Sequence, residues 1–358
     1  MLIRYGKNNK NKTVRVARIY TRHEHNLDKN LIDKDALHII QRLNYFSYQA
    51  YIVGGAVRDL LLGKIPKDFD IVTDAPPGKI RRIFRNSRII GRRFKLVHIY
   101  YGRNKNIEVS TFRSGESGPG ENYYGTIDED ARRRDITINA LYYCPKSEQL
   151  IDYVDGYSDL MTGKISCLTP TDKSFLEDPV RMIRIIKYAS DLDFKINSQI
   201  KKSIKKNAHL LNDCSKSRLT EEIFKILKSG SARKIFYYLI DFDLFRYIQP
   251  RYFSLMQNKK NYNAFILDME KLDESISLWN ESRAKEKAIA LYARQALKDY
   301  FDYSKDNIHK QFFLKIKDIF YPLTPPNADV DGAVKIIMQE KGLGHSRAHY
   351  QKRKAVFG

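Results

Sequence analysis

The spacing of apolar residues changes character once along this chain of 358 residues, and that change limits the folds open to it. From residue 33 to about residue 170, short strand-like apolar runs alternate with segments of helical period. After about residue 175 the strand signals stop, and helical segments follow one another to about residue 320. We therefore predict an α+β chain, in which an N-terminal α/β domain precedes all-helical domains.

Segments of unusual composition suggest further domain boundaries. The first 22 residues are basic and contain few apolar side chains, and residues 321–329 (YPLTPPNAD) are rich in proline. We expect a flexible basic arm (1–32), a head domain (33–170), a helical neck (171–250), a helical body (251–320), and a linker with a basic tail (321–358).

Local signals place elements within the head. A helix is expected from Asp33, and a tight turn at Gly54-Gly55 is expected to lead into a short helix that ends at Gly63. The remaining expected elements are strands at 50–53, 68–73, 93–101 and 106–112, a helix at 77–86, a mobile Ser/Gly-rich loop at 114–127, and a helix from near Asp128.

The charge balance points to a polyanionic partner. There are 64 Lys and Arg residues against 42 Asp and Glu, which gives a formal net charge of +22. A basic surface kept for solubility is the alternative, but it seldom needs so large an excess. Three cysteines in no metal-binding spacing fit a reducing cytoplasm, and no apolar run is long enough to cross a membrane. We expect a cytoplasmic protein that binds nucleic acid and has no membrane partner.

An acidic pair is the first candidate for chemistry. Asp68 and Asp70 are two residues apart on an expected strand, so both carboxylates should point to one side while Phe69 points into the core. Such pairs also occur on solvated surfaces. Just upstream, however, Gly54 and Gly55 let the backbone approach a phosphate, and Arg58 adds a charged donor. A phosphate cradle beside two carboxylates indicates metal-assisted phosphoryl chemistry.

Glu108 offers a third carboxylate on the strand at 106–112. By itself it would be interpreted as an ordinary exposed strand residue. Together with the Asp pair it predicts a site for two Mg²⁺ ions, because oxygen ligands suit this ion and it also binds substrate phosphates. One ion would activate a 3′-hydroxyl, and the other would stabilise a triphosphate and the leaving pyrophosphate.

Two further segments carry charged residues in suggestive patterns. In residues 130–139 an arginine cluster precedes Asp135 and Asn139, and we interpret it as a contact for triphosphate oxygens and ribose hydroxyls, the alternative being a solvated helix face. In residues 177–187, Asp178, Arg181 and Arg184 recur along one side of a helix that Asp178 could cap and Pro179 could start. A carboxylate beside a guanidinium can read the edge of a base in place of a template strand.

Five segments in this order resemble the successive motifs of one family, the class II nucleotidyltransferases of the polymerase-beta-like superfamily, which comprise bacterial poly(A) polymerases and CCA-adding enzymes. They are VGGAVRDLLLG, KDFD, IEVSTFR, EDARRRDITINAL and EDPVRMIRIIKYA. The similarity runs from about Asp33 to Pro250. Within the family, the stretch IIGRRFKLVH resembles poly(A) polymerases rather than CCA-adding enzymes, and its His98 receives no catalytic role.

The resemblance implies roles for individual residues. It implies Asp68 and Asp70 as metal ligands, and it places Asp178 and Arg181 at the base edge with Arg184 nearby. It also implies Gly55 and Arg58 at the triphosphate, and Arg134 with Asp135 at the nucleotide. Lys187 stands where relatives often have arginine, so this chain departs from the family pattern there.

We therefore expect a template-independent polynucleotide adenylyltransferase, a poly(A) polymerase that adds AMP from ATP to RNA 3′ ends. We expect the neck (171–250) to bind the nucleotide base and RNA, and the body (251–320) to bind RNA. The RNA could be mRNA, small RNA or tRNA, and no DNA partner is expected. A tRNA CCA- or A-adding enzyme is the alternative, with the same chemistry but CTP as well as ATP accepted. A non-catalytic RNA-binding protein that has kept the fold is the third interpretation, against which the intact acidic and arginine set argues.

Overall fold

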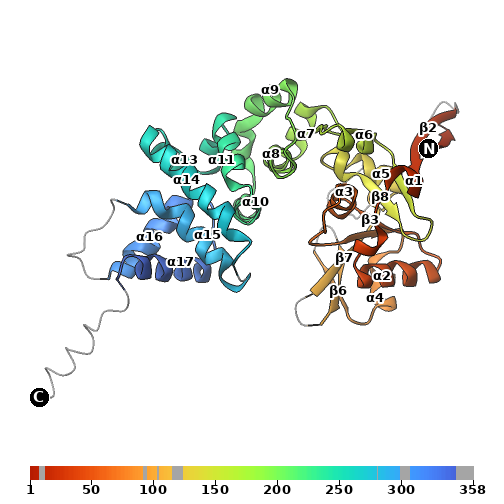
Figure 1. Cartoon of the computed structure of the whole chain (residues 1–358), viewed down its shortest axis with the longest axis horizontal. Coiled ribbons are helices and arrows are strands. Elements are labelled where there is room, and N and C mark those ends of the chain that lie inside the picture. The colour runs from red at the N-terminus through yellow and green to blue at the C-terminus, as the bar shows by residue number, and fades with distance from the viewer. Residues whose placement is uncertain are drawn as a thin grey trace, which may run out of the picture. The chain divides into compact units, whose positions relative to one another are not determined.

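The computed structural model describes residues 1–7, 13–91, 95–102, 105–114, 124–279, 281–298 and 307–343. Within it the chain forms two compact units, Met1–Pro170 and Thr171–Gly358 (Figure 1). Most of the expected loop at 114–127 and the last part of the expected basic tail lie outside the described residues. No helix of the described part of the chain is long and apolar enough to cross a membrane.

The first unit is built on one mixed sheet with the strand order β1-β2-β9-β8-β3-β4-β7-β6-β5. Most neighbours are antiparallel, but β4 and β7 run parallel. The strands are β1 (Leu2–Lys7), β2 (Thr13–Tyr20), β3 (Ala50–Val53), β4 (Asp70–Thr73), β5 (Ser87–Ile90), β6 (Leu96–Tyr101), β7 (Lys105–Thr111), β8 (Leu141–Cys144) and β9 (Gln149–Asp152).

Short helices connect these strands and cover the sheet. The expected helix from Asp33 is confirmed, because the Asp33 carboxylate accepts the backbone N–H groups of Asp35 and Ala36 and so caps α2. Helices α2 and α4 pack against each other and against the sheet. The helices of this unit are α1 (Arg22–His25), α2 (Lys34–Tyr45), α3 (Gly55–Leu61), α4 (Pro77–Ile83), α5 (Ile127–Arg132) and α6 (Gly156–Met161).

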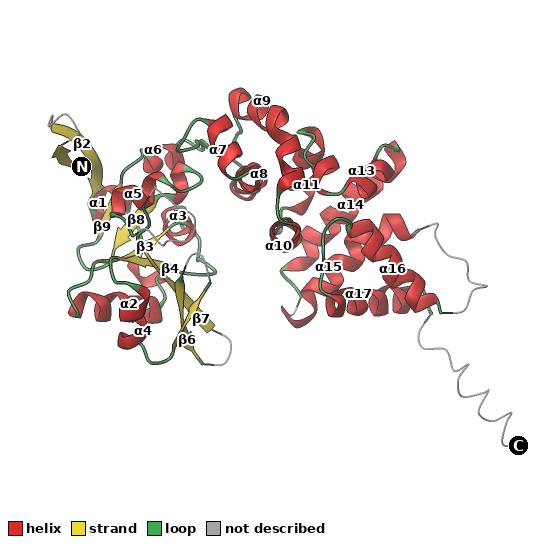
Figure 2. Ribbon diagram, turned by 180° about the vertical axis from the view of Figure 1, so that it is seen from behind, coloured by secondary structure: helices red, strands yellow, loops and turns green. Residues whose placement is uncertain are grey.

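The second unit contains helices and no strands among its described residues, as Figure 2 shows by colour. Its core is aromatic, and the rings of Phe236, Phe245, Tyr252, Phe265 and Tyr292 contact one another. Its helices are α7 (Thr171–Glu177), α8 (Val180–Leu192), α9 (Ser198–Asn207), α10 (Lys216–Leu227), α11 (Ala232–Asp241), α12 (Phe245–Ile248), α13 (Pro250–Met256), α14 (Lys259–Ile276), α15 (Glu281–Ala293), α16 (Ile308–Phe320) and α17 (Asn327–Glu340).

The two ends of the chain differ from the expectation. Residues 1–32 are not a flexible arm, because β2 pairs with β9 through Arg18, Ile19 and Tyr20, and Tyr20 is buried. Residues 321–358 are not only linker and tail, because α17 packs on α15 and α16. In both segments, apolar residues between the charged ones supply the contacts that hold the backbone in place.

Two element boundaries in the head also differ. The expected strand at 68–73 begins only at Asp70, and the expected helix at 77–86 ends at Ile83 and is followed by the unexpected strand β5. The short run Ser87–Ile90 pairs with β6, and only this tertiary partner reveals it as a strand.

Candidate active site

A tight turn joins β3 to α3 at Gly54. Its φ angle of 73° lies in the left-handed region that glycine adopts without strain. A Cβ atom on Gly54 would lie 3.4 Å from Nη1 of Arg134, so a side chain there would crowd the guanidinium. The turn therefore brings the backbone at the start of α3 and an arginine side chain together, as a phosphate contact requires.

Asp70 and Glu108 lie side by side on parallel neighbouring strands. Asp70 opens β4, and its register partner on β7 is Glu108. Burial raises the pKa of Asp70 to about 6, and the charges of Glu108 and Asp68 add to the rise while Arg134 opposes it. Although the Asp70 residue retains solvent exposure, its carboxylate is closely surrounded by protein atoms and by like charges.

Asp68 lies in the loop before β4 rather than on the strand. The intervening Phe69 is buried, as expected. Among the described residues, no three His, Cys, Asp or Glu side chains come together closely enough to form a metal-binding group. Glu108 and Asp68 nevertheless both act electrostatically on Asp70, and a cation among the three would relieve the repulsion that adds to the rise in the pKa of Asp70. Their oxygen donors fit Mg²⁺.

His98 is the neighbour of Glu108 on the other side. It is the register partner of Glu108 on β6, and its Nε2 atom lies 3.8 Å from a Glu108 carboxylate oxygen. The sequence alone assigned no role to His98. It lies beside Glu108 because β6 and β7 pair antiparallel, which brings together two residues ten positions apart.

Arg134 is held rigidly next to these acidic residues. Its Nε and Nη2 atoms donate to one oxygen of Asp130 at 3.3 and 3.0 Å, and Nε also donates to the Tyr142 hydroxyl at 3.2 Å. Burial by itself lowers the pKa of Arg134, but Tyr142 and Asp130 raise it overall. The guanidinium is therefore charged and fixed in place, which suits binding of a phosphate.

A second network joins the remaining candidates of the head. Arg58 donates to Oδ1 of Asn139 at 2.8 Å and to its neighbour Asp59 at 2.7 Å. Asn139 in turn donates to Asp135 at 3.4 Å, and Asp135 accepts the N–H of Ile136. Gly54, Gly55, Arg58, Arg134, Asp135 and Asn139 are thus connected by contacts that run from α3 to the segment after α5.

The candidate base-reading residues lie in the second unit and are engaged with other side chains. The Asp178 carboxylate accepts from Nη2 of Arg218 at 2.8 and 3.0 Å, and it also accepts the N–H of Val180. Arg181 donates to Ser174 at 3.0 Å and lies 3.3 Å from Glu177. Asp178 is not the N-cap considered as an alternative, because α8 begins at Val180 and Pro179 occupies the cap position. Its carboxylate nevertheless accepts the first N–H of α8 and has Arg218 as a second, charged partner.

The other two basic residues of α8 are paired as well. Arg184 lies 3.5 Å from Glu222 on α10, and Lys187 lies 3.1 Å from Asp191 within α8. Sequence reasoning missed Arg218 and Glu222. Because they are four residues apart, both lie on one side of α10. Only the packing of α10 against α8 shows that this side faces the candidate base-reading residues.

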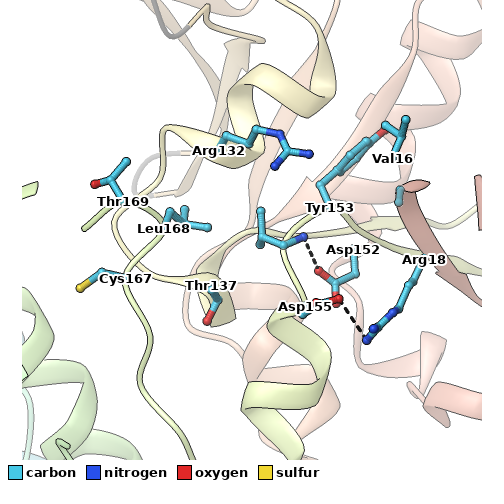
Figure 3. A pocket seen from close by; sticks show the side chains of 12 residues that line it. Val16, Arg18, Arg132, Thr137, Asp152, Tyr153, Asp155, Cys167, Leu168 and Thr169 are labelled. Atoms are coloured by element: carbon cyan, nitrogen blue, oxygen red, sulfur yellow. Dashed lines mark hydrogen bonds and ion pairs between the residues drawn. The ribbon is translucent and has the colours of Figure 1, made fainter. Parts of the chain in front are cut away.

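A separate cavity of about 550 Å³ lies beside β2 and β9 (Figure 3). Its lining includes an ion pair between Arg18 and Asp155 at 3.0 Å, and Asp152, whose carboxylate accepts the N–H of Val154. Its described lining includes Arg132 of the arginine cluster in residues 130–139, but not Asp68, Asp70, Glu108 or Arg134. The cavity therefore does not belong to the site formed by Asp70 and Arg134.

Comparison with known proteins decides the family. Residues 50–166 match the family described as poly A polymerase head domain, and residues 193–256 match that described as probable RNA and SrmB-binding site of polymerase A. A CCA-adding enzyme of Lactobacillus gasseri is 30% identical over 279 residues, which cover 71% of this chain and 69% of the enzyme. The chain belongs to the class II nucleotidyltransferases. Poly(A) polymerase I of Salmonella typhi is 40% identical over 255 residues, or 66% of this chain, and the chain spans only 55% of that protein.

Solved structures of class II nucleotidyltransferases share the fold. A tRNA nucleotidyltransferase complexed with a primer tRNA and an incoming ATP analog has a TM-score of 0.60 and 25% identity, over 88% of this chain and 86% of that one. The CCA-adding enzyme of Bacillus stearothermophilus in complex with CTP has a TM-score of 0.57 and 24% identity, over 86% and 82%. These matches confirm the predicted fold class, a polymerase-beta-like head followed by helical neck and body regions.

Proposed function

We propose that this chain is a template-independent polynucleotide adenylyltransferase that adds AMP from ATP to RNA 3′ ends. The observation that carries the proposal is the pairing of Asp70 with Glu108 at the edge of a fixed arginine site. The proposal is supported because carboxylates of a kind that binds Mg²⁺ and a guanidinium of a kind that binds phosphate interact electrostatically here. The 40% identity to poly(A) polymerase I supports adenylate addition rather than another transfer.

Different residues of the head would bind different parts of the nucleotide. Arg134 and Arg58, with the backbone at Gly54 and Gly55, would orient the triphosphate, and Asp135 and Asn139 would contact the ribose hydroxyls. Asp70, Glu108 and Asp68 would hold two Mg²⁺ ions. When bound, these ions lower the pKa of the attacking hydroxyl and stabilise the triphosphate.

The reaction itself is a displacement at phosphorus. The RNA 3′-hydroxyl loses its proton and its oxygen forms a bond to the α-phosphorus of ATP, while the bond from that phosphorus to the pyrophosphate oxygen breaks. The protein positions the groups, and its arginines stabilise the charge on the leaving pyrophosphate. Asp178 and Arg181 would select adenine, with Arg184 and Lys187 nearby on the same helix.

The alternative is addition of CCA, or of its terminal A, to tRNA. It is favoured by the curated and structural relatives that are CCA-adding enzymes. One incorporation assay separates the candidates. The protein is incubated with an unstructured RNA, with tRNA that ends in -CC, and with tRNA that lacks CCA, each with a single nucleoside triphosphate at a time.

We expect repeated AMP incorporation into the unstructured RNA from ATP alone. Incorporation of CMP into tRNA that lacks CCA, together with a single AMP on tRNA ending in -CC, would instead establish the tRNA-processing activity. Absence of incorporation on all three substrates, with RNA binding retained, would leave a non-catalytic RNA-binding protein.

A further inference from the structure

The paired carboxylates belong to a row of side chains that crosses four strands of the sheet. Asp70 on β4 is the register partner of Glu108 on β7, which in turn pairs with His98 on β6. His98 pairs with Arg88 on β5, the last strand in the sheet order. Register partners on neighbouring strands project from the same face of a sheet. Arg88 therefore lies on the same face as the carboxylates, two strand spacings or ~10 Å from Glu108.

This face of the sheet is accessible to solvent on β5 and β6. Helix α4 packs against both strands and covers the side on which Val97 and Ile99 are buried. On the other side, Arg88 and Tyr100 are exposed and His98 is half-buried. The rings of His98 and Tyr100 contact each other, with 6.3 Å between their centroids. Arg88, His98 and Tyr100 thus form one surface, which we call the β5–β6 face.

The charge of Arg88 is not compensated by an acidic side chain. Among the described residues, no carboxylate lies within ion-pair distance of its guanidinium. A charged residue on an edge strand also discourages pairing with other chains, which is an alternative explanation of the charge. That role could be filled at any exposed position of the edge, whereas Arg88 occupies the position in line with the carboxylates. Its place in the row therefore points to an anion that extends toward Glu108 and Asp70.

The candidates for nucleotide binding lie on the other side of the acidic residues. Gly54 and Arg58 follow β3, and Asn139 precedes β8. In the order of the sheet, β3 and β8 lie on one side of β4, while β7, β6 and β5 lie on the other. In phosphoryl transfer the attacking and leaving oxygens are roughly in line, with the phosphorus between them. A triphosphate bound on the β3 side therefore leaves the β7–β6–β5 side for the attacking RNA 3′ end.

The β5–β6 face offers the two kinds of contact that bind a single strand of RNA. A guanidinium binds a backbone phosphate, and an accessible ring stacks on a base whatever the sequence. The Tyr100 side chain is 40% exposed and can serve as that ring. A protein partner would need an apolar centre for its interface, which Arg88 and the half-buried His98 do not supply.

We propose that the β5–β6 face holds the 3′-terminal part of the RNA, in which Arg88 binds a phosphate just upstream of the 3′ end and Tyr100 stacks on a base. Both residues bind and orient the RNA, and neither takes part in the chemical step. The proposal rests on the proposed function, because it places the second substrate of that reaction.

Binding without turnover tests Arg88. The affinity of the full chain for a 5′-labelled single-stranded RNA of about 10 nucleotides, within the ~4–16 that one binding module covers, is measured by fluorescence anisotropy without nucleotide over a salt series. For R88Q we expect at least about fivefold weaker binding at low salt and a salt slope smaller by ~0.7, the contribution of one phosphate contact on a single strand. Unchanged affinity and slope would overturn the proposal.

A matched variant controls for net charge. Arg82 of α4 is also exposed, has no carboxylate partner among the described residues, and lies on the helix that covers the other face of β5 and β6. R82Q should bind RNA like the unmodified protein. An equal loss of affinity in R88Q and R82Q would show a general effect of charge and refute a local site. Thermal melting of each variant verifies the fold.

Photo-cross-linking tests which part of the RNA lies on the β5–β6 face. One RNA carries 4-thiouridine next to its 3′ end and a second carries it at the 5′ end, and mass spectrometry identifies the linked peptides. We expect the 3′ probe to link to β5 or β6, with a yield at least about fivefold lower in Y100A. Y45A, which removes the 84% exposed ring of Tyr45 on α2, should leave the yield unchanged. Links to β5 or β6 from the 5′ probe alone, or equal losses in both variants, would refute the proposal.

Steady-state kinetics separate this proposal from the proposed function. R88Q should raise the KM for RNA at least about fivefold and leave the KM for ATP unchanged. An equal rise in both KM values would place Arg88 at the nucleotide and overturn the proposal. An unmodified protein that adds no nucleotide, yet binds and cross-links RNA as expected, would refute only the proposed function.

Discussion

At the scale of single residues, Asp70 interacts electrostatically both with the carboxylates of Glu108 and Asp68 and with Arg134. Replacing it with Asn keeps the shape but removes the charge, so we expect nucleotide addition to fall by at least about a hundredfold. Asp68→Ala should have a similar effect, and Glu108→Ala a severe one. Binding of Mn²⁺, measured by electron paramagnetic resonance, should weaken in the same variants. Activity near that of the unmodified protein in Asp70→Asn would refute the metal site, and unchanged melting would show that the fold is intact.

Base choice should depend on Arg181. Guanine and uracil reverse at least part of the donor and acceptor order of adenine, and each unpaired buried group costs ~1–3 kcal/mol. Arg181→Ala should therefore reduce the preference for ATP over GTP and UTP by about five- to 150-fold, measured as a ratio of kcat/KM values. Because Arg181 also contacts Ser174 and Glu177, a loss of rate is expected too. A slower variant with the same selectivity would show that the residue is structural.

A variant of Arg218 can distinguish the role of Asp178 in selecting the base from its role in starting helix α8. Its guanidinium holds the Asp178 carboxylate, while the contact of that carboxylate with the N–H of Val180 does not need it. We expect Arg218→Ala to lower nucleotide selectivity with little change in melting temperature, because the ion pair is partly exposed and such pairs stabilise weakly. A lowered melting temperature with unchanged selectivity would contradict this prediction. Arg218→Lys, which keeps the charge, serves as the comparison.

At the scale of elements, the N-terminal strands are the clearest test of the fold. Deleting residues 1–22 removes β1 and β2 and leaves the edge of β9 unpaired. We expect the melting temperature to fall by at least about 5 °C, since each kcal/mol shifts it by ~2–4 °C in a domain of this size. Deleting only residues 1–7 retains β2 and should have a smaller effect. Equal melting of the long deletion and the intact chain would mean that this segment is an arm after all.

The sequence predicted secondary structure well where an element depends on contacts between residues close together in the chain. The Asp33 cap and the glycine turn before α3 depend on residues within a few positions of each other. The start of β4 and the pairing of β2 depend on partners far along the chain, and charged residues such as Arg18 concealed the strand character of β2. The strand β5 pairs with the neighbouring β6, but its four residues are too few to show a strand pattern without that partner. The roles of the site residues were inferred from motif order, but neither Arg218 beside Asp178 nor His98 beside Glu108 is visible before the fold is known.

At the scale of the whole molecule, we expect net charge to govern the affinity for the proposed RNA substrate. Binding of RNA by a chain with a formal charge of +22 would release cations that are condensed on the RNA phosphates. The logarithm of the affinity should therefore fall linearly with the logarithm of the salt concentration, by ~0.7 per phosphate contact. ATP presents far fewer phosphates and should show a shallower slope. Filter binding of RNA and calorimetry of ATP over the same salt series check this. Equal slopes for the two ligands would contradict an RNA grip made mainly through phosphates.

The pairing of β2 with β9 also sets an order of events during synthesis. Ile19 meets Ile151, so the two strands are separated by about 130 residues, and closing so long a loop is slow relative to forming local turns. On the ribosome, β2 emerges early and has no partner on this side until the β8–β9 hairpin follows it. An unpaired strand edge is a template for other chains. The edge of β2 is therefore open to pairing with other chains during most of the synthesis of the head. It is covered only when β9, the last strand of the sheet, has been made.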